Sequence, residues 1–317
     1  MSQSYVSGYV TRNNESVFPI VSPDNKGVKP SGWVNKNKQW LDENLRENGA
    51  VLLRGFDIHS LSEFNKFSLN YKGNLLSYDN ASTPRTRLGG NIYTSTEYPK
   101  DVVIPQHNEK SYTNQWPNTL MFFSITVAEE GGYTPLADSG RILARLNRDI
   151  LSRMEEYGIL YVRNYHENLD LSWQEVFQTE IKEDVESYCL NNEIDFEWIN
   201  SGEQLRTKQK SKFTLVHPET NEQVWFNQSN LFHISALGKA GGELRTQLGL
   251  DNVPRNCYFG NGEEIPNEFM EKINEAIHAE TFSFPWKKGD ILLVDNIRMT
   301  HGRTTFSGQR KVAVAMA

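Results

Sequence analysis

The sequence predicts a mostly β fold with flanking helices, an α+β protein built on a double-stranded β-helix (jelly roll). Two observations lead to this fold class. Short apolar runs typical of buried strands recur along the 317 residues, and helical patterns separate them as large insertions. There is no internal repeat and no linker that would mark a domain boundary. We therefore expect one catalytic domain over residues 1–317.

The N-terminal part of the chain alternates between polar and apolar segments. Residues 1–30 are rich in Asn, Ser and Pro, and we expect an irregular arm there. Trp33, Trp40, Leu41 and Leu45 are spaced to share one helical face, and Gly49 ends that helix. A buried strand is expected over 50–56, and a second helix over 61–71.

A long polar segment follows, over residues 77–106. It consists largely of Gly, Asn, Thr, Ser and Pro, without periodicity. Long loops of this kind inside a compact domain are often functional. We therefore expect residues 77–106 to form a lid loop over an active site.

The remaining elements follow from apolar spacing. The sequence predicts strands over 119–127, 213–216, 224–226, 291–294 and 312–316, and helices over 142–157, 173–188 and around 269–277. Gly131 and Gly132 mark a turn. The basic run over 207–212 is expected to be a solvated loop between elements.

Composition limits the function classes. The net charge of −7 and the pI near 5.6 disfavour nucleic acid as a partner. The apolar runs are too short to span a membrane, and residues 1–5 lack the pattern of a signal peptide, so we expect a cytoplasmic protein. Two cysteines cannot form a disulfide framework, so a metal site must rely on His and carboxylate ligands. A homo-oligomer is compatible with the sequence, which does not indicate an oligomeric state.

One candidate metal-binding pair lies shortly before the strand at 119–127. His107 and Glu109 are two positions apart, and residues so spaced in an extended segment point to the same face. An imidazole and a carboxylate placed in this way can bind one cation. Most His-x-Glu pairs, however, are surface or core residues that bind no metal.

A third ligand candidate and a cation follow the last buried strand. His301 comes shortly after the polar end of the strand at 291–294, and two His with one carboxylate is the ligand set of non-haem Fe(II) oxygenases. Arg310 can bind a carboxylate through both arms of its guanidinium. The alternatives are a core or capping role for His301 and a surface ion pair for Arg310.

The other histidines are interpreted as structural. His59 is expected in a turn, His166 and His217 at strand ends, and His278 on a helix flank. His233 follows a segment of polar residues among aromatics; a satisfied core histidine is favoured there over a pocket wall.

Taken together, these segments resemble the TauD/TfdA-like family of Fe(II)/2-oxoglutarate dioxygenases, closest to its SyrP-like branch of amino-acid hydroxylases. The resemblance extends from about Trp33 to the end of the chain and keeps the family's order. It is carried by IYTSTEYP (92–99), HNE (107–109) with Ser111, Tyr112, Trp116 and Pro117, GGYTPLAD (131–138), VWFNQ (224–228) and HGRTTFSGQR (301–310).

The resemblance implies roles for five residues. It implies that His107, Glu109 and His301 bind Fe(II), and that Thr134 and Arg310 hold the distal carboxylate of 2-oxoglutarate. Many members of the family have Asp where this chain has Glu109, a longer arm that should still reach the metal. The implied reaction consumes O2 and 2-oxoglutarate and hydroxylates an unactivated C–H bond of an amino acid or amino-acid-derived substrate in natural-product biosynthesis.

The substrate and the outcome of the reaction stay open. Candidate substrate contacts are Tyr93, Ser95 and Glu97 before the HNE motif, together with Asn227 and Arg303; hydrogen bonding within loops is the equally plausible alternative for each. A free amino acid, one presented by a carrier protein and a small peptide are all compatible, although the acidic net charge disfavours an acidic carrier. The same iron site could carry out desaturation, cyclisation or epoxidation, and a non-catalytic jelly-roll binding module is a further alternative.

Overall fold

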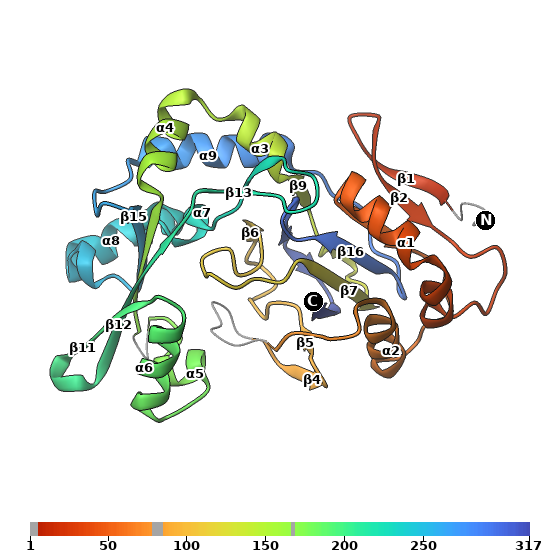
Figure 1. Cartoon of the computed structure of the whole chain (residues 1–317), viewed down its shortest axis with the longest axis horizontal. Coiled ribbons are helices and arrows are strands. Elements are labelled where there is room, and N and C mark those ends of the chain that lie inside the picture. The colour runs from red at the N-terminus through yellow and green to blue at the C-terminus, as the bar shows by residue number, and fades with distance from the viewer. Residues whose placement is uncertain (1–5, 78–84, 166–168) are drawn as a thin grey trace.

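The computed structural model describes residues 6–77, 85–165 and 169–317. Its largest element is an eight-stranded sheet at the right of Figure 1. In spatial order its strands are β1 (Val6–Arg12), β2 (Glu15–Val21), β3 (Ala50–Leu53), β16 (Ile291–Asp295), β7 (Thr119–Thr126), β19 (Lys311–Met316), β5 (Ile92–Thr94) and β4 (Arg87–Gly89). The central strands β3, β16, β7 and β19 are continuous apolar runs because they are buried on both faces.

Two helices cover one face of this sheet. They are α1 (Pro30–Asn48), which begins with Pro30 and ends at the left-handed Gly49, and α2 (Leu61–Lys72). Their apolar sides pack with the outward residues of β3, β7 and β16 into one core that includes Leu41, Phe64 and Phe123. This layer covers the face of the sheet that points away from the small sheet described next.

A smaller sheet lies on the opposite face. Its three strands are β6 (Ile104–His107), β17 (Met299–Arg303) and β9 (Leu136–Asp138), all antiparallel. The ring of Phe122 on β7 lies 5.4 Å from the ring of His301 on β17, so the two sheets face each other. The strand pair β8 (Glu130–Gly131) and β18 (Phe306–Ser307) joins them at one end. This two-sheet core is the expected jelly roll.

The inserted segments form a second, smaller body at the left of Figure 1. Its sheet has the order β11 (Asp195–Ile199), β12 (Gln204–Ser211), β10 (Ile159–Asn164) and β15 (Arg255–Phe259). Around it lie α3 (Ser139–Arg145), α4 (Arg148–Tyr157), α5 (Trp173–Phe177), α6 (Lys182–Asn191), α7 (Ser229–Phe232), α8 (Gly238–Leu248) and α9 (Asn267–Glu280). The hairpin of β13 (Thr214–Val216) and β14 (Gln223–Trp225) crosses between the two bodies.

Four expectations from the sequence need correction. The arm expected to be irregular contains the β1–β2 hairpin, whose turn residues Asn13 and Asn14 have φ of 50° and 66°, as a tight hairpin turn requires. The loop expected over 77–106 contains β4, β5 and the start of β6, while residues 78–84 lie outside the described residues. The helix expected over 173–188 is two helices, because Gln178 ends α5 in the left-handed conformation. The basic run over 207–212 lies mostly in β12, where Thr207 and Gln209 point inward and the lysines outward.

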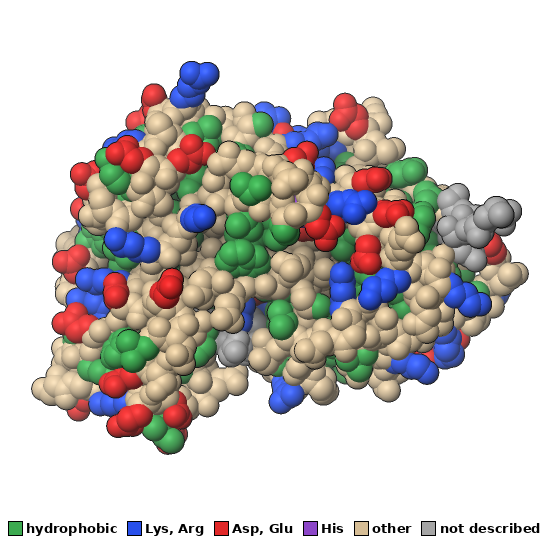
Figure 2. All heavy atoms as spheres, in the orientation of Figure 1, with side chains coloured by type: hydrophobic (Ala, Val, Ile, Leu, Met, Phe, Trp, Pro, Cys, Tyr) green, Lys and Arg blue, Asp and Glu red, His purple; other side chains and the backbone are tan. Residues whose placement is uncertain are grey.

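The surface agrees with the composition. Figure 2 shows acidic and basic side chains interspersed over the face that it presents. Within the described ranges, no helix is both long and apolar enough to cross a membrane.

Candidate metal centre

The three predicted ligand residues come together at one end of the small sheet. His301 on β17 is the direct antiparallel partner of His107 on β6, and their ring centroids are 4.3 Å apart. One possible ligand atom from each of His107, Glu109 and His301 lies within 4.8 Å of the others, and all three residues are buried. Among the described residues, no other group of His, Cys and acidic side chains meets this criterion.

Glu109 is not held by strand alternation. β6 ends at His107, and Glu109 lies in the turn that follows, just before the left-handed Lys110 (φ 57°). The expectation that an extended segment alone would align the two ligands is therefore wrong in its detail. The N–H and the carbonyl of Glu109 are hydrogen-bonded to the side chain of Asn296.

The histidines are in the form that binds a metal. Nδ1 of His107 lies 2.8 Å from the carbonyl oxygen of Pro105; if Nδ1 carries the proton, Nε2 is left with its lone pair. Burial lowers the pKa of His107, and burial together with His107 and Arg85 lowers the pKa of His301 well below its ordinary value. Both rings are therefore neutral at pH 7.

The carboxylate of Glu109 has a cation beside it. Nη2 of Arg85 donates to Oε2 of Glu109 at 2.5 Å, and both side chains are buried. Burial raises the pKa of Glu109, but Arg85 and His107 lower it more, so the net pKa is below its ordinary value. Glu109 is thus ionised at neutral pH.

This donor set fits a divalent iron ion. Nε2 of His301 lies 3.9 Å from Oε2 of Glu109. With bonds of about 2.1 Å, as imidazole and carboxylate make to zinc, two ligands of one ion are at most about 4.2 Å apart. Two neutral imidazoles and one carboxylate leave other positions of an octahedral ion open.

Arg310 and Thr134 lie in the same cavity as the two histidines. Nε of Arg310 donates to the carbonyl of Gly132 at 2.8 Å, and Nη2 lies 3.4 Å from Oγ1 of Thr134. The indole N–H of Trp286 donates to the same Oγ1 at 3.1 Å. Burial and the neighbouring Arg303 lower the pKa of Arg310 to about 10, so it remains charged at pH 7.

The glycine turn allows this close approach. A Cβ on Gly131 would lie 2.2 Å from the carbonyl oxygen of Thr305, and one on Gly132 would lie 2.9 Å from Cδ of Arg310. Both glycines also have positive φ, 67° and 65°. Only glycines let β8 and its turn approach Arg310 this closely.

The cavity among these residues has a volume of about 30 Å³. His107, His301, Thr134, Arg310, Arg85 and Phe122 are among its lining residues. Ser95, Thr96, Arg303 and Arg310 line both this cavity and a larger, more open hollow of about 660 Å³. The hollow and the cavity are therefore adjacent, with these four residues between them.

The predicted substrate contacts have different environments. Ser95 lines both spaces, and its hydroxyl is 3.4 Å from Nη1 of Arg310. Glu97 is exposed at the outer hollow and accepts from Thr86. Tyr93 is part of the buried core between the sheets.

Asn227 and Arg303 have structural partners instead. The Asn227 amide donates to the carbonyl of Phe213 and accepts from both the N–H and the hydroxyl of Ser229, and Asn227 lines neither space. Arg303 donates to the carbonyls of Tyr98, Pro99 and Val102. Arg303 also lines both the cavity and the hollow, and the substrate roles expected of the two residues stay predictions.

The other histidines lie apart from the site. His217 is buried against Asp295, His233 bonds Ser235 and Ile265, and His59 pairs with Asp57 at the surface. His166 lies outside the described residues.

Sequence reasoning missed three residues at the site: Arg85, Asn108 and Asn296. Asn108 was visible between the two ligands of the HNE motif, and Asn296 at the polar end of a predicted strand. Arg85 lies in a polar segment that gave no signal.

Comparison with known proteins identifies the family. The family model described as "Taurine catabolism dioxygenase TauD, TfdA family" matches residues 16–316. The chain belongs to this family. It is therefore an oxidoreductase that depends on Fe(II) and 2-oxoglutarate, as the resemblance implied.

Two curated proteins are similar in sequence. The dapdiamide synthesis protein DdaC of Enterobacter agglomerans is 41% identical over 277 residues, which cover 87% of this chain and 84% of DdaC. A clavaminate synthase-like protein of Arabidopsis thaliana is 29% identical over 293 residues, which cover 89% of this chain and 86% of that protein.

Two solved structures share the fold. PvcB from Pseudomonas aeruginosa, described as an Fe, alpha-ketoglutarate dependent oxygenase from an isonitrile synthetic pathway, aligns with a TM-score of 0.58 and 12% identity, covering 100% of this chain and 92% of PvcB. An asparagine oxygenase in complex with Fe(II), 2S,3S-3-hydroxyasparagine and succinate aligns with a TM-score of 0.55 and 11% identity, covering 90% of this chain and 79% of that one.

Proposed function

We propose that this chain hydroxylates an unactivated C–H bond of an amino acid or amino-acid-derived substrate, free or attached to a carrier protein, in natural-product biosynthesis. The supporting observation is that His107, His301, Thr134 and Arg310 line one cavity, and that Glu109 joins the two histidines in one cluster of possible metal ligands. DdaC is named for the synthesis of dapdiamide, and the asparagine oxygenase structure contains a hydroxylated amino acid.

In this proposal each residue has one task. His107, Glu109 and His301 hold Fe(II), and Arg310 with Thr134 binds the distal carboxylate of 2-oxoglutarate through charge-assisted hydrogen bonds. When bound, the iron, 2-oxoglutarate and O2 together supply the oxidising power. The protein orients the two reactants and limits the access of water.

The route to the iron passes the segment expected to act as a lid. Arg85, Ser95, Thr96 and Ile104 line the inner cavity, and residues 94–98 line the outer hollow. We propose that the described part of this segment forms one wall of the substrate path, with Ser95 and Glu97 as the polar groups that a substrate meets there. An amine on the substrate would find a partner in the Glu97 carboxylate.

The test is a screen for coupled turnover. The protein, reconstituted with Fe(II), is mixed with 2-oxoglutarate, O2 and a panel of amino acids, both free and attached to a carrier protein. We expect succinate to rise with one class of substrate, together with a product heavier by one oxygen atom. A product lighter by two hydrogens would show desaturation instead, and the absence of 2-oxoglutarate consumption by folded wild type would contradict the iron assignment.

A further inference from the structure

The backbone of Glu109 is bound on both sides by one side chain. Oδ1 of Asn296 accepts from the Glu109 N–H at 2.7 Å, and Nδ2 of Asn296 donates to the Glu109 carbonyl at 3.0 Å. The same Nδ2 donates to the carbonyl of Pro117 at 2.8 Å. Asn296 is fully buried, where polar groups need hydrogen-bond partners within the protein.

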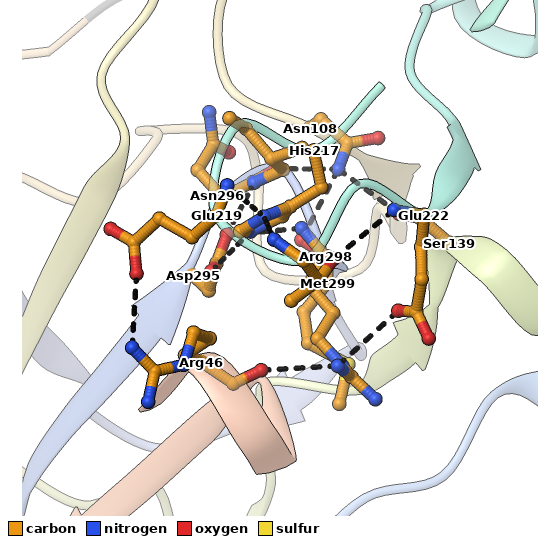
Figure 3. A network of polar contacts seen from close by, with 12 residues as sticks. Arg46, Asn108, Ser139, His217, Glu219, Glu222, Asp295, Asn296, Arg298 and Met299 are labelled. Atoms are coloured by element: carbon orange, nitrogen blue, oxygen red, sulfur yellow. Dashed lines mark hydrogen bonds and ion pairs between the residues drawn. The ribbon is translucent and has the colours of Figure 1, made fainter. Parts of the chain in front are cut away.

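A second asparagine forms the reciprocal contact. Asn108, which lies between the two ligand residues, donates from Nδ2 to the carbonyl of Asn296 at 2.6 Å and to that of Met299 at 3.3 Å. Figure 3 shows Asn108, Asn296 and Met299 in one network of polar contacts. Asn108 belongs to the turn after β6, and Asn296 to the connection from β16 to β17, which carries His301. The two amides therefore cross-link the two segments that hold the three ligands.

The base of this cross-link is rigid. Oδ1 of Asp295 accepts from the N–H groups of Ile297 and Arg298, which closes the turn around Asn296, and Oδ2 of Asp295 lies 2.9 Å from Nε2 of His217. The carbonyl of Asn108 in turn accepts from Gln228 at 2.8 Å. These bonds hold the two backbone segments that carry Asn108 and Asn296, and Figure 3 shows Asp295 and His217 in the same network.

The chemistry of this contact requires an amide. Asn296 presents one acceptor and two donors to three backbone groups. Asp at this position would offer no donor to the carbonyls of Glu109 and Pro117, and Ala would leave all three groups buried without a partner, at about 1–3 kcal/mol each. Glu109 lies in a turn and not in a strand. Among the described residues, no other side chain bonds both its N–H and its carbonyl.

We propose that Asn296 is the positioning residue for the carboxylate ligand, and that with Asn108 it sets the affinity of the site for iron. This inference rests on the proposed role of Glu109 as a ligand. Residues that orient metal ligands typically change metal affinity by about 10- to 100-fold when replaced. We expect a weakening of this size for Asn296→Ala.

The matched control is Asn164 in the four-stranded sheet. Asn164 is also buried. Its side chain donates to the carbonyls of Asp251 and Val253 and accepts from Arg206. It lines neither the cavity nor the hollow. Asn164→Ala removes two bonds to backbone carbonyls and one to the Arg206 side chain, close to the three backbone bonds lost in Asn296→Ala, so it reports the general cost of losing a buried asparagine.

The experiment measures the dissociation constant for Fe(II) by anaerobic competition with a chelator, and the visible spectrum of the Co(II)-substituted protein. We expect Asn296→Ala to bind Fe(II) about 10- to 100-fold more weakly and to alter the Co(II) spectrum, while Asn164→Ala matches wild type in both. Equal affinities for wild type and Asn296→Ala would overturn the inference.

Two further results separate the possible failures. A folded wild type that binds no Fe(II) would contradict the proposed function itself, and not the positioning role alone. If Asn296→Ala does not fold, Asn108→Ala decides, because it breaks the same cross-link from the other segment. Affinity within twofold of wild type for Asn108→Ala would then overturn the proposal.

Discussion

His301 lies directly opposite His107 in the antiparallel pair of β6 and β17, with their ring centroids 4.3 Å apart. Two residues separated by most of the chain become neighbours because these strands pair in one register. A shift of one residue would turn one of the rings to the other face of the sheet. The iron site therefore depends on the packing between β6 and β17.

Gly302 tests this dependence. A Cβ on Gly302 would lie 2.6 Å from the carbonyl oxygen of Ile104 on β6. We expect Gly302→Ala to push the strands apart, to lower the free energy of unfolding by about 1–3 kcal/mol, and to weaken Fe(II) binding. Urea unfolding and metal titration measure the two effects. The control is Gly242→Ala in α8, where the new Cβ meets nothing within 4 Å; equal behaviour of the two variants would contradict the argument.

The role of Arg310 in binding 2-oxoglutarate can be tested by substitution. Arg310→Lys keeps the positive charge but removes the planar fork that binds a carboxylate with two hydrogen bonds. The loss of one charge-assisted bond, about 1.5–3 kcal/mol, corresponds to a rise in the dissociation constant for 2-oxoglutarate of about 10- to 100-fold. Calorimetric titration of the Mn(II)-loaded protein measures it, with the exposed Arg245→Lys as control. An unchanged constant for Arg310→Lys would remove Arg310 from the co-substrate site.

Arg303 distinguishes a structural role from a substrate contact. It donates to three carbonyls of residues 98–102, at 2.6–2.9 Å. We expect Arg303→Met to lower the free energy of unfolding by about 2–4 kcal/mol, because these carbonyls lose their donor. Urea unfolding is the measurement, and the exposed Arg141→Met should change stability by no more than about 0.5 kcal/mol. Unchanged stability with a raised KM for the substrate would restore the carboxylate-binding hypothesis.

The ion pair of Asp170 with Arg255 should make stability depend on pH. Burial raises the pKa of Asp170, but Arg255, which donates from Nε to Oδ2 at 2.8 Å, lowers it more, so the folded pKa lies below 3.8. A depressed folded pKa means that the stabilisation is complete above the unfolded pKa of about 3.9 and is lost as pH falls through the folded value.

Asp170→Asn should therefore cost about 3 kcal/mol at pH 7. This cost should begin to shrink below about pH 4, where Asp170 of the unfolded chain takes up a proton, and should be lost as pH falls through the lower pKa of the folded state. Unfolding free energies of both proteins from pH 7 to pH 3 measure it. A difference that stays constant over this range would show that the charge of Asp170 contributes nothing.

The parts of the fold that could be predicted from the sequence are those where burial dominates. The strands β3, β7, β16 and β19 are continuous apolar runs, and α1 ends at Gly49 as its spacing indicates. In β12, by contrast, the inward positions include Thr207 and Gln209, so alternation of apolar and polar residues gave no signal. The Asn13–Asn14 turn was a signal for the N-terminal hairpin that composition alone concealed.

The site residues also fall into two groups: those that the sequence indicates and those that only the fold brings together. The residue types of His107, Glu109, His301 and Arg310 indicate their chemistry, so motif and resemblance identified them together. Arg85 and Asn296 act through contacts between segments far apart in the chain, and only the fold brings them to Glu109. Asn227 and Arg303 were chosen for plausible chemistry; the fold gives both residues bonds to backbone carbonyls, which the sequence did not indicate, and their substrate roles stay predictions.

The central claim is that His107, Glu109 and His301 hold an iron ion to which 2-oxoglutarate also binds. Its most direct test is an anaerobic titration of the purified protein with Fe(II) and 2-oxoglutarate, recording the weak visible charge-transfer band of the chelate. We expect the band in wild type and in Asn227→Ala, and no band in His107→Ala. No band in a folded wild-type protein, or an undiminished band in folded His107→Ala, would contradict the account.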